Sequence, residues 1–356
     1  MSDFLVIGGG IAGLSAAARL SEFGTATVLE TETGLGYHTS GRSAALFEES
    51  YGAAAVVMLN RASHAFLRDG GYLSPRGMML IATEANAALF DADMAKMGLD
   101  PISAAEAIDW VPILNPAVVT RAGRSRNAWD IDTDRLLQDF AREVRSAGGT
   151  VLTSHPVTKI TKTGKGWDLV AGGETFSAPV LVNAAGAWAD EVAGMAGIAP
   201  LGLQPMRRSM ARIPAPGGHD ISTWPMMFGA GEEWYAKPDA GALLVSPAEE
   251  YPMEPHDAWP DDMVLAEGIA RYEAVMTEPV TRLLASWAGL RTFSRDRVLV
   301  LGPEPADPSF VWAAGQGGYG FQTCAAASRL VADLVGGRAS ELDADIVARL
   351  RPDRFR

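Results

Sequence analysis

The sequence predicts an α/β protein, α+β overall, on three observations. A glycine fingerprint lies between a short apolar strand and a helix at the N-terminus. A second uncharged strand, 179–183, ends in the small-residue turn Ala184-Ala185-Gly186. Between 203 and 244, aromatic and Met residues alternate with small ones, as in a sheet with one face on a pocket. Together they indicate a parallel sheet with helices and a second, sheet-based domain.

The N-terminal fingerprint follows an apolar run without charge, 4–7, which is typical of a parallel strand covered on both faces. Gly8, Gly10 and Gly13 then form G-x-G-x-x-G. The first glycine allows a tight turn, the second lets the backbone approach a pyrophosphate, and the third lets the following helix pack against the strand. The pattern predicts a dinucleotide site.

The continuation supports this interpretation. Residues 11–23 are rich in Ala and Leu and predict a helix that Gly24 ends. A second strand, 27–29, delivers Glu30 about twenty residues beyond Gly10, the usual offset for a carboxylate that binds ribose hydroxyls. Because this acid disfavours a 2′-phosphate, FAD or NAD is favoured over NADP.

Composition limits the function classes. The net charge of −13 argues against binding to nucleic acid or to an anionic membrane surface. Cys324 is the only cysteine, so we expect no disulfide framework, a reducing compartment and no structural metal. Asp3, the three glycines and Arg19 make the N-terminal run a poor signal peptide or membrane span. We expect a cytoplasmic protein without a transmembrane segment; peripheral contact with the inner face of a membrane stays open.

The remaining elements follow from periodicity and turn residues. A helix begins near Asn60, and Asp132 is placed to cap another. Further helices are expected over 84–97, 104–108, 134–147, 266–276 and 321–335. Further strands are expected over 78–82, 150–152, 157–161, 167–170, 174–177, 203–214, 298–301 and 310–313. The loop 31–52 carries glycines, small residues and Arg42, which suit a diphosphate; a solvated surface loop is the alternative.

The blocks GGGIAG, VLE and GYHTSGRSAA resemble the D-amino-acid oxidase family of flavoproteins, which includes glycine oxidase and sarcosine oxidase. The chain most resembles bacterial D-arginine dehydrogenases. LVNAAGAWAD, LGLQPMRRS, WYAKPDAG, SWAGLRTF and VWAAGQGGYGFQT follow in the family's order, so the resemblance covers nearly the whole chain.

The resemblance implies a Rossmann-type FAD-binding domain of the glutathione-reductase type, over 1–75, 132–204 and 296–356. It also implies a substrate-binding domain with a large mixed or antiparallel sheet, over 76–131 and 205–295. FAD is expected to be non-covalent, because neither Cys324 nor His38 matches a flavin-linking position. The cofactor residues implied are Gly8, Gly10, Ile11, Ala12, Gly13, Glu30, Thr31, Gly41, Arg42, Ser43, Ala44, Ala45, Val157, Ala185, Gly186, Trp188, Gly289, Arg291, Gly315, Gly317, Gly318, Tyr319, Gly320, Phe321 and Gln322. A simple core role for Trp188 stays open.

The family's reaction moves a hydride from the substrate Cα to flavin N5, and the imine is hydrolysed to a 2-oxo acid and ammonia. Arg208 and Arg291 match the two arginines that bind the substrate carboxylate, which suits a planar guanidinium. Arg207 points the other way if the segment is a strand. Tyr51 and Tyr235 match tyrosines that hydrogen-bond substrate, and Gly318 and Gln322 match positions lining the amine and flavin. The helix from Phe321 would direct its positive end at the flavin.

The substrate side-chain pocket departs from the D-arginine dehydrogenases. Leu46 stands at the position of their His, and Met78 at that of the Glu that binds the guanidinium. An unpaired cation buried against these residues, Met226 and Phe228 would cost several kcal/mol. The resemblance with these departures therefore predicts apolar or small neutral D-amino acids over D-Arg, unless Met78 is simply core.

Two other functions stay open. The same fold could oxidise a secondary amine such as sarcosine or proline, or a 2-hydroxy acid, since paired arginines suit any of these carboxylates. A non-catalytic flavin-binding subunit is the other alternative. The sequence assigns no general base, so we expect kcat/KM to rise with pH through one ionisation, that of the substrate amine. Oxygen and a quinone are both open as electron acceptor.

Overall fold

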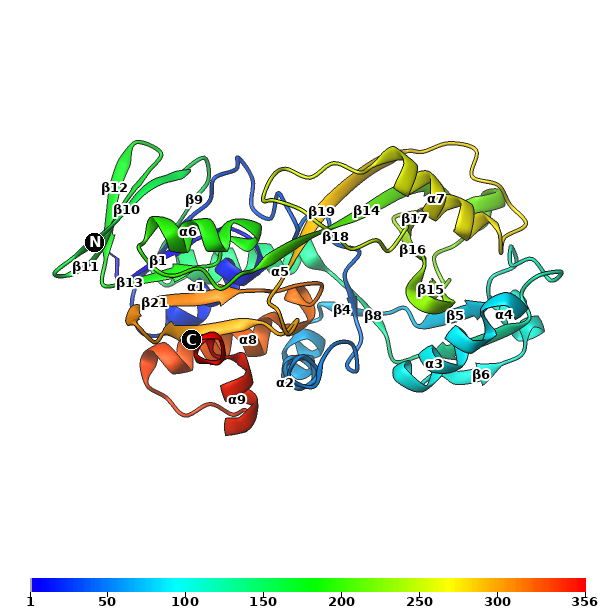
Figure 1. The fold of residues 1–356 in the computed structure, drawn as a ribbon, viewed down its shortest axis with the longest axis horizontal. Helices are drawn as coiled ribbons and strands as arrows, with labels where there is room; N and C mark the ends of the chain where they lie inside the picture. The colour runs from blue at the N-terminus through cyan, green and yellow to red at the C-terminus, as the bar shows by residue number, and fades with distance from the viewer. Residues whose placement is uncertain (1) are drawn as a thin grey trace.

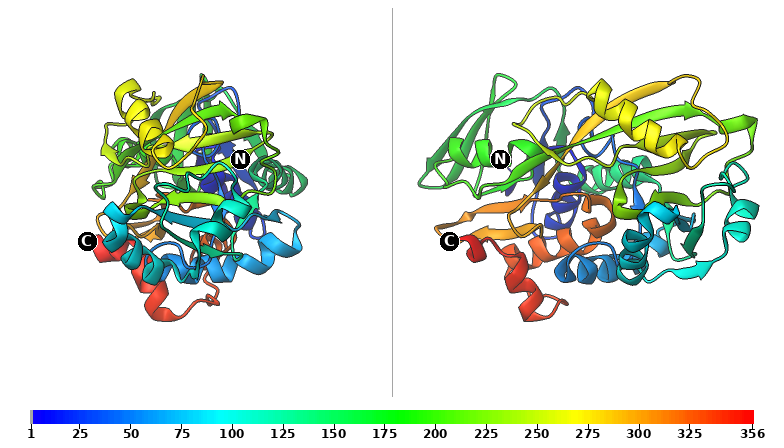
Figure 2. Two further views of the ribbon diagram at one scale, coloured as in Figure 1. Left: turned by 90° about the vertical axis from the view of Figure 1, so that its right-hand side faces the viewer. Right: turned by 45° about the vertical axis from the view of Figure 1, so that its right-hand side comes forward.

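The structure is a computed structural model that describes residues 2–356. The molecule is elongated, with two lobes that are each built around one large sheet (Figure 1). Both chain ends lie in the lobe of the first sheet. The turned views in Figure 2 show that long strands of the second sheet extend from one lobe to the other.

The first sheet has six strands in the order β20-β21-β13-β1-β2-β9, parallel except for the edge strand β20. The strands are β1 (Phe4–Ile7), β2 (Ala26–Leu29), β9 (Thr150–Leu152), β13 (Val180–Asn183), β20 (Val300–Glu304) and β21 (Asp307–Ala314). β1 is buried on both faces, as its uncharged sequence predicts.

Helices cover one face of this sheet and a small antiparallel sheet covers the other. Phe4 and Val6 pack with α1 (Ile11–Leu20), α2 (Ala54–Asp69), α5 (Thr133–Ser146) and α8 (Gly320–Gly336). Leu5 and Ile7 pack with α6 (Ala189–Met195) and the three-stranded sheet β10 (Val157–Thr163), β11 (Gly166–Ala171) and β12 (Glu174–Ala178). Because successive side chains of β1 point to opposite faces of the sheet, this strand contributes to two separate hydrophobic cores.

The second sheet has nine strands in the order β18-β14-β17-β16-β15-β5-β7-β6, with β19 also paired to β14. They are β5 (Met78–Ala82), β6 (Asp100–Ile102), β7 (Arg121–Ser125), β14 (Gln204–Pro214), β15 (Met226–Gly229), β16 (Tyr235–Asp239), β17 (Ala242–Ser246), β18 (Tyr251–Pro252) and β19 (Ala285–Phe293). Apart from Gln204 at the start of β14, all nine lie within 76–131 and 205–295, the segments that the resemblance implies for a substrate-binding domain.

A third sheet of three short strands joins the lobes: β3 (Leu46–Phe47), β4 (Leu73–Pro75) and β8 (Trp129–Ile131). The other helices are α3 (Ala87–Met97), α4 (Ala104–Trp110), α7 (Asp262–Glu273) and α9 (Ala344–Leu350). Short 3-10 turns are η1 (Glu84–Asn86), η2 (Gly186–Trp188), η3 (Pro216–Gly218), η4 (Ala230–Glu232) and η5 (Pro352–Phe355). Within residues 2–356, no helix combines the length and apolarity needed to cross a membrane.

The α/β prediction is confirmed, but some elements differ at their ends and others, among them α6, β6, β7 and β19, were not predicted. α1 ends at Leu20, before the predicted 23. α2 begins at Ala54 rather than near Asn60, and α9 was not predicted. α7 lies four residues earlier than predicted because the Asp261 side chain caps it, accepting from the amides of Met263 and Val264. Asp132 caps α5 as predicted.

Candidate active site

The turn from β1 to α1 has the geometry that the glycine fingerprint predicts. Gly8 has φ +111°, and a Cβ there would lie 2.4 Å from the carbonyl oxygen of Ala184. A Cβ at Gly13 would lie 2.0 Å from the carbonyl oxygen of Gly8. No larger residue fits either position. The close approach also brings the Ala184-Ala185-Gly186 turn against the fingerprint.

Glu30 ends β2 beside this turn. Its carboxylate accepts hydrogen bonds from the backbone amides of Gly9 (2.6 Å) and Glu32 (2.8 Å). The amide of His155 donates to the Glu30 carbonyl at 2.8 Å, which brings the segment leading into Val157 alongside. The structure therefore brings together the residues predicted for the adenosine end of a dinucleotide.

Two helix N-termini meet next to this point. A Cβ at Gly320, the first residue of α8, would lie 3.2 Å from the Cγ2 of Ile11, the first residue of α1. Neither Gly10 nor Tyr319 provides a side-chain cap, so the positive ends of both helices lack a capping oxygen from those residues. Such a pair fits an anionic diphosphate and an electron-rich ring edge. These residues fit FAD.

The loop 31–45 folds over the start of α1. The amide of Ile11 donates to the Ser40 hydroxyl at 3.1 Å. The Arg42 guanidinium does not point to this helix end: it pairs with Asp257 at 2.6 Å and donates to the carbonyls of Ala258 (3.1 Å) and Ala288 (2.8 Å). Arg42, which the sequence analysis placed at the diphosphate, therefore fastens the loop to the second lobe in this structure.

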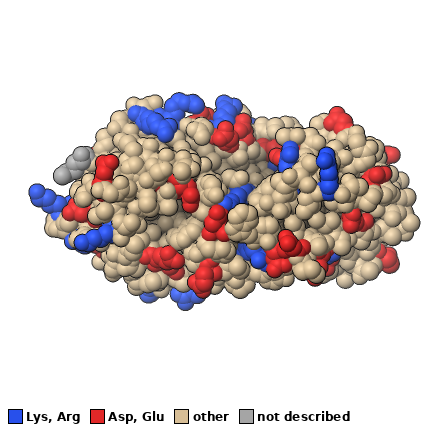
Figure 3. Space-filling view, turned by 90° about the horizontal axis from the view of Figure 1, so that it is seen from above, with Lys and Arg blue, Asp and Glu red and all other residues tan. Residues whose placement is uncertain are grey.

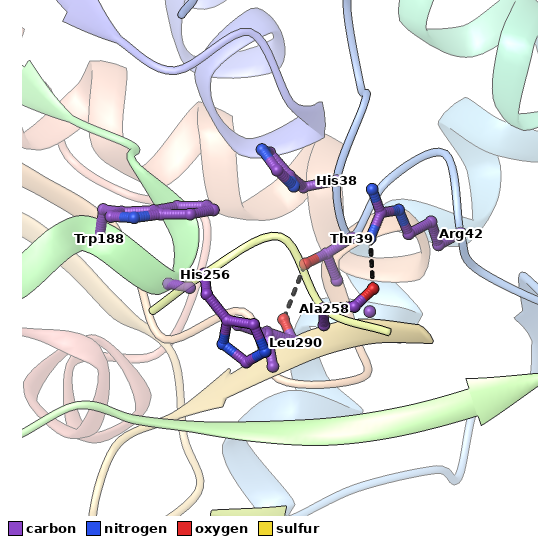
Figure 4. A pocket seen from close by; sticks show the side chains of 9 residues that line it. His38, Thr39, Arg42, Trp188, His256, Ala258 and Leu290 are labelled. Carbon is purple, nitrogen blue, oxygen red and sulfur yellow. Dashed lines mark hydrogen bonds between the residues drawn. The ribbon is translucent and has the colours of Figure 1, made fainter. Parts of the chain in front are cut away.

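A small hollow lies between this loop and β19 (Figure 4). Thr39 donates to the Leu290 carbonyl at 2.7 Å across it. His38 is 2.9 Å from the Glu32 carboxylate, and its ring centroid lies 4.7 Å from that of Trp188. Gly289 also lines the hollow. Three predicted cofactor positions, Arg42, Trp188 and Gly289, thus line the same hollow.

Arg208 and Arg291 lie on the same face of the β14–β19 pair. In this antiparallel register Met206 faces Arg291 and Arg208 faces Gly289. Residues directly opposite point to the same side, so the two guanidinium groups are diagonal neighbours. Arg207 points to the other face, where it lies 3.8 Å from Glu249. The alternation expected of this strand is present.

The environment of each arginine perturbs its pKa differently. Burial lowers the pKa of Arg208, and the nearby positive charge of Arg291 lowers it further. Burial also opposes the charge on Arg291, but the neighbouring Tyr235, Tyr51 and Glu250 together hold the pKa of Arg291 above its ordinary value. Two adjacent guanidinium groups in a desolvated place make a strong anion site.

Tyrosines and a glycine surround the arginines. The buried Tyr235 has a hydroxyl without a partner among the described residues, and its ring centroid lies 5.8 Å from the Arg208 guanidinium. Tyr51 is 40% exposed and packs its ring 5.3 Å from Tyr319. A Cβ at Gly318 would lie 3.2 Å from Nη1 of Arg291, so only glycine leaves this approach free.

Gln322 supports the loop that carries Tyr51. Its buried side-chain amide donates to the Tyr51 carbonyl at 3.5 Å and accepts from the Glu48 amide at 3.4 Å. The contacts in the structure therefore assign Gln322 to holding this loop. Its position at the start of α8 keeps it next to Gly318.

The four predicted pocket residues cluster. Met226 and Met78 face each other in the β15–β5 pair, and both are buried. Leu46 and Phe228 pack against both of them in adjoining apolar clusters. The Phe228 ring lies 6.2 Å from that of Tyr235, which links this apolar group to the arginine site.

A buried charged network beside Leu46 was not predicted from the sequence. The Lys237 ammonium donates to the carbonyl of Ala44 at 2.5 Å and pairs with Asp130 at 2.9 Å. The other oxygen of Asp130 accepts from Arg76 at 2.5 and 2.8 Å. Two cations therefore face this one carboxylate. The only sequence signal for this network was Lys237-Pro238 in the block WYAKPDAG, and it did not reveal Asp130 as the partner of Lys237.

Three more charged residues near the site were missed. Burial raises the pKa of the Glu48 carboxyl, which accepts a hydrogen bond from the Ser50 amide. Glu250 pairs with Arg208 at 3.1 Å, and Arg297 pairs with Glu250 at 2.9 Å. Glu250 belongs to an acidic, Pro-rich stretch that the sequence indicates only as a surface loop.

The environment of Cys324 does not favour a reactive thiol. It is buried among apolar residues of α1 and α8, and burial raises the pKa of its thiol to about 12. A protonated thiol is a poor nucleophile. Within residues 2–356 no group of three or more His, Cys, Asp or Glu side chains is arranged to hold a metal ion.

Comparison with known proteins identifies the family. Residues 3–334 match the DAO family, described as FAD dependent oxidoreductase. The chain is 24% identical to FAD-dependent oxidoreductase domain-containing protein 1 of Bos taurus, over 94% of this chain and 81% of that protein. It is 26% identical to hydrogen cyanide synthase subunit HcnC of Pseudomonas aeruginosa, over 62% of this chain and 52% of that protein.

Solved structures share the fold. Glycine oxidase from Geobacillus kaustophilus has a TM-score of 0.82 at 22% identity, covering 97% of both chains. L-proline dehydrogenase from P. horikoshii has a TM-score of 0.81 at 19% identity, over 99% of this chain and 97% of that one. L-α-glycerophosphate oxidase from Mycoplasma pneumoniae, solved with FAD bound, has a TM-score of 0.81 at 19% identity, over 96% of each chain. At these identities the likeness shows the fold alone.

Proposed function

The chain belongs to the DAO family of FAD-dependent oxidoreductases, and on that premise we propose that it oxidises D-amino acids with apolar or small neutral side chains. The substrate loses two electrons and two protons and becomes an imino acid, which water hydrolyses to a 2-oxo acid and ammonia. The single observation that supports this most is the pair of partly buried arginines next to an apolar cluster.

Arg208 and Arg291 bind and orient the substrate carboxylate. A guanidinium presents two parallel N–H groups to a carboxylate and so fixes its orientation as well as its charge. Within residues 2–356 no salt bridge reaches Arg291, and Gly318 leaves the space in front of its Nη1 open. The unpartnered hydroxyl of Tyr235 adds a further hydrogen bond for the same ligand.

FAD, when bound, supplies the two-electron acceptor for the Cα–H bond. The residues of this chain place that bond: the arginines hold the carboxylate, and the apolar cluster holds the side chain. We assign no side chain as the base for the amine, because an ammonium that loses its proton to solvent before oxidation needs none. Oxygen or a quinone would reoxidise the cofactor.

The apolar cluster supports the proposed side-chain preference. A basic side chain directed at Met78, Met226 and Phe228 would bury an unpaired charge, which costs several kcal/mol. Asp130 is already paired with two cations, Lys237 and Arg76, which disfavours a third. The other acids near the site are Glu250, which pairs with Arg208 and Arg297, and Glu48, whose pKa is raised by burial.

Secondary amines and 2-hydroxy acids are the second candidate class. The carboxylate site would accept them equally, and two proteins of the same fold are a glycine oxidase and an L-proline dehydrogenase. Glycine, sarcosine and proline have no side chain or one closed into a ring, so they would leave the apolar cluster partly unfilled. We therefore favour substrates with an apolar side chain.

The preference is tested by introducing an acid into the cluster. Met78→Glu places a carboxylate opposite Met226, and we expect kcat/KM for D-Arg to rise about tenfold while that for D-Leu falls, because a charged hydrogen bond contributes about 1.5–3 kcal/mol. Met78→Gln, which has the same shape without charge, should lower D-Leu activity without the D-Arg gain. Wild-type protein that already prefers D-Arg would refute the proposed preference.

A further inference from the structure

One of the two carboxylate-binding arginines already holds a carboxylate. The Nη2 of Arg208 lies 3.1 Å from Oε1 of Glu250. On its other side, Glu250 accepts from Nη2 of Arg297 at 2.9 and 3.0 Å. The Arg208 side chain is 13% exposed, that of Glu250 30% and that of Arg297 46%, so the three lead from the site to solvent.

Arg297, which contacts Glu250, has an unusual backbone conformation. Its φ is +61°, a region that side chains other than glycine rarely adopt. Its guanidinium lies 3.9 Å from the ring centroid of Phe293, which is two residues beyond Arg291 on β19. The ring fixes the guanidinium over the edge of the substrate site.

The Arg208–Glu250 contact leaves donors of Arg208 unused. Glu250 reaches one guanidinium nitrogen, whereas the Nε of Arg208 is buried without a partner among the described residues. A carboxylate that binds Arg208 through two parallel bonds would therefore satisfy a donor that Glu250 does not. Two carboxylates at one guanidinium also repel each other.

We propose that Glu250 is an affinity-determining residue that competes with the substrate carboxylate for Arg208, and that Arg297 holds Glu250 when the substrate binds. In the unliganded site Glu250 neutralises part of the positive charge of Arg208. In the liganded site it keeps its two contacts to Arg297 and releases Arg208. The inference rests on the proposed function, since it requires that Arg208 bind the carboxylate of a substrate.

The test measures carboxylate binding rather than turnover. The probe is 4-methylpentanoate, which is leucine without its amine, titrated into the FAD-loaded protein and followed by calorimetry. Glu250→Gln removes the competing charge but keeps the shape, and we expect the Kd to fall about fivefold, the upper range for partly exposed ion pairs. Glu254→Gln in the same loop is the matched control, because Glu254 is exposed and its side chain makes no contact with either arginine; it should leave the Kd unchanged.

Arg297→Gly tests the second half of the inference. Glycine suits φ +61°, so this variant is expected to fold. Without Arg297, Glu250 stays on Arg208, and the Kd of the probe should rise. In the double variant Arg297→Gly/Glu250→Gln the Kd should equal that of Glu250→Gln alone, because the competitor is gone.

The outcomes separate this inference from the proposed function. If 4-methylpentanoate binds the wild-type protein and Glu250→Gln with the same Kd, or binds the variant more weakly, the competition is refuted and the role of Arg208 is untouched. If the probe binds neither protein, the assignment of a carboxylate to this site fails as well. An additive effect of Arg297→Gly in the double variant would refute the role of Arg297.

Discussion

In the function that we propose, Arg291 is the residue on which substrate binding depends most directly. It has no salt bridge within residues 2–356 and lies against Gly318. We expect Arg291→Lys to lower kcat/KM for D-Leu about 100-fold, because an ammonium cannot make two parallel bonds to the carboxylate. Steady-state kinetics measures this loss.

Arg207→Lys is the matched control. It carries the same chemical change on the neighbouring strand but on the opposite face, beside Glu249. Its kcat/KM should change about twofold or less, as expected for a remote ion pair. Equal losses in both variants would mean that Arg291 acts on the fold rather than on the substrate.

Glu48 makes stability depend on pH. Burial raises the pKa of its carboxyl in the folded protein, so the folded state binds the proton more tightly than the unfolded state does. Its contribution is therefore most favourable below the ordinary pKa of a Glu carboxyl, 4.5, and is lost as pH rises through the folded pKa. Glu48→Gln, which cannot ionise and keeps an acceptor for Ser50, should raise the Tm more at pH 8 than at pH 5. An equal shift at both pH values would contradict this.

At the residue scale, the sequence is informative where a family motif and strand alternation agree. Arg208 and Arg291 follow from RRSM and AGLRTF, and alternation separates Arg208 from Arg207. Glu250 could not be predicted, because its partners lie 42 and 47 residues away and only the tertiary fold brings them to it. Lys237 could not be predicted either, because its partners, the Ala44 carbonyl and Asp130, lie far from it in the sequence.

At the element scale, Lys237 on β16 fixes the short strands that join the lobes. Its ammonium holds the Ala44 carbonyl and Asp130 of β8. Removing one partner of a buried ion pair lowers the stability of the folded protein by about 3 kcal/mol. Lys237→Met should therefore lower the temperature at which the heated protein releases its flavin, as followed by flavin fluorescence. The loop of Ala44 and Ala45, where the resemblance implies cofactor contact, would loosen first.

The control for this prediction is an exposed pair. Lys96→Met breaks the contact with Glu232, in which both side chains are about half exposed or more. Such a pair contributes about 1 kcal/mol or less. Flavin release should therefore be unchanged in Lys96→Met. If Lys237→Met also left it unchanged, the buried network would not stabilise the cofactor loop.

Element ends were the weakest part of the sequence-based description, for physical reasons. The start of α2 at Ala54 lacks a side-chain cap, so no sequence signal marks it. α7 begins at a true cap, Asp261, but its surroundings are Pro-rich and acidic and indicate a loop. The 11-residue β14 and the hairpin of β11 and β12, by contrast, follow from alternation and from Gly172-Gly173.

At the scale of the whole molecule, the two large sheets carry different parts of the candidate site. The first sheet carries the dinucleotide turn, and β14 and β19 of the second bring the arginines to the junction of the lobes (Figure 1). Acidic and basic side chains are interspersed on the face shown in Figure 3, so this face carries no basic surface that would attract an anionic substrate.

An anaerobic titration of the FAD-loaded protein tests the central claim most directly, with the absorbance of oxidised flavin as readout. D-Met, D-Leu and D-Phe should bleach this band, whereas their L-forms, D-Arg, sarcosine and 2-hydroxy acids should leave it unchanged. This result requires both the arginine pair and the apolar cluster. Bleaching by D-Arg or by L-amino acids, or by none of these compounds while FAD is bound, would contradict the account.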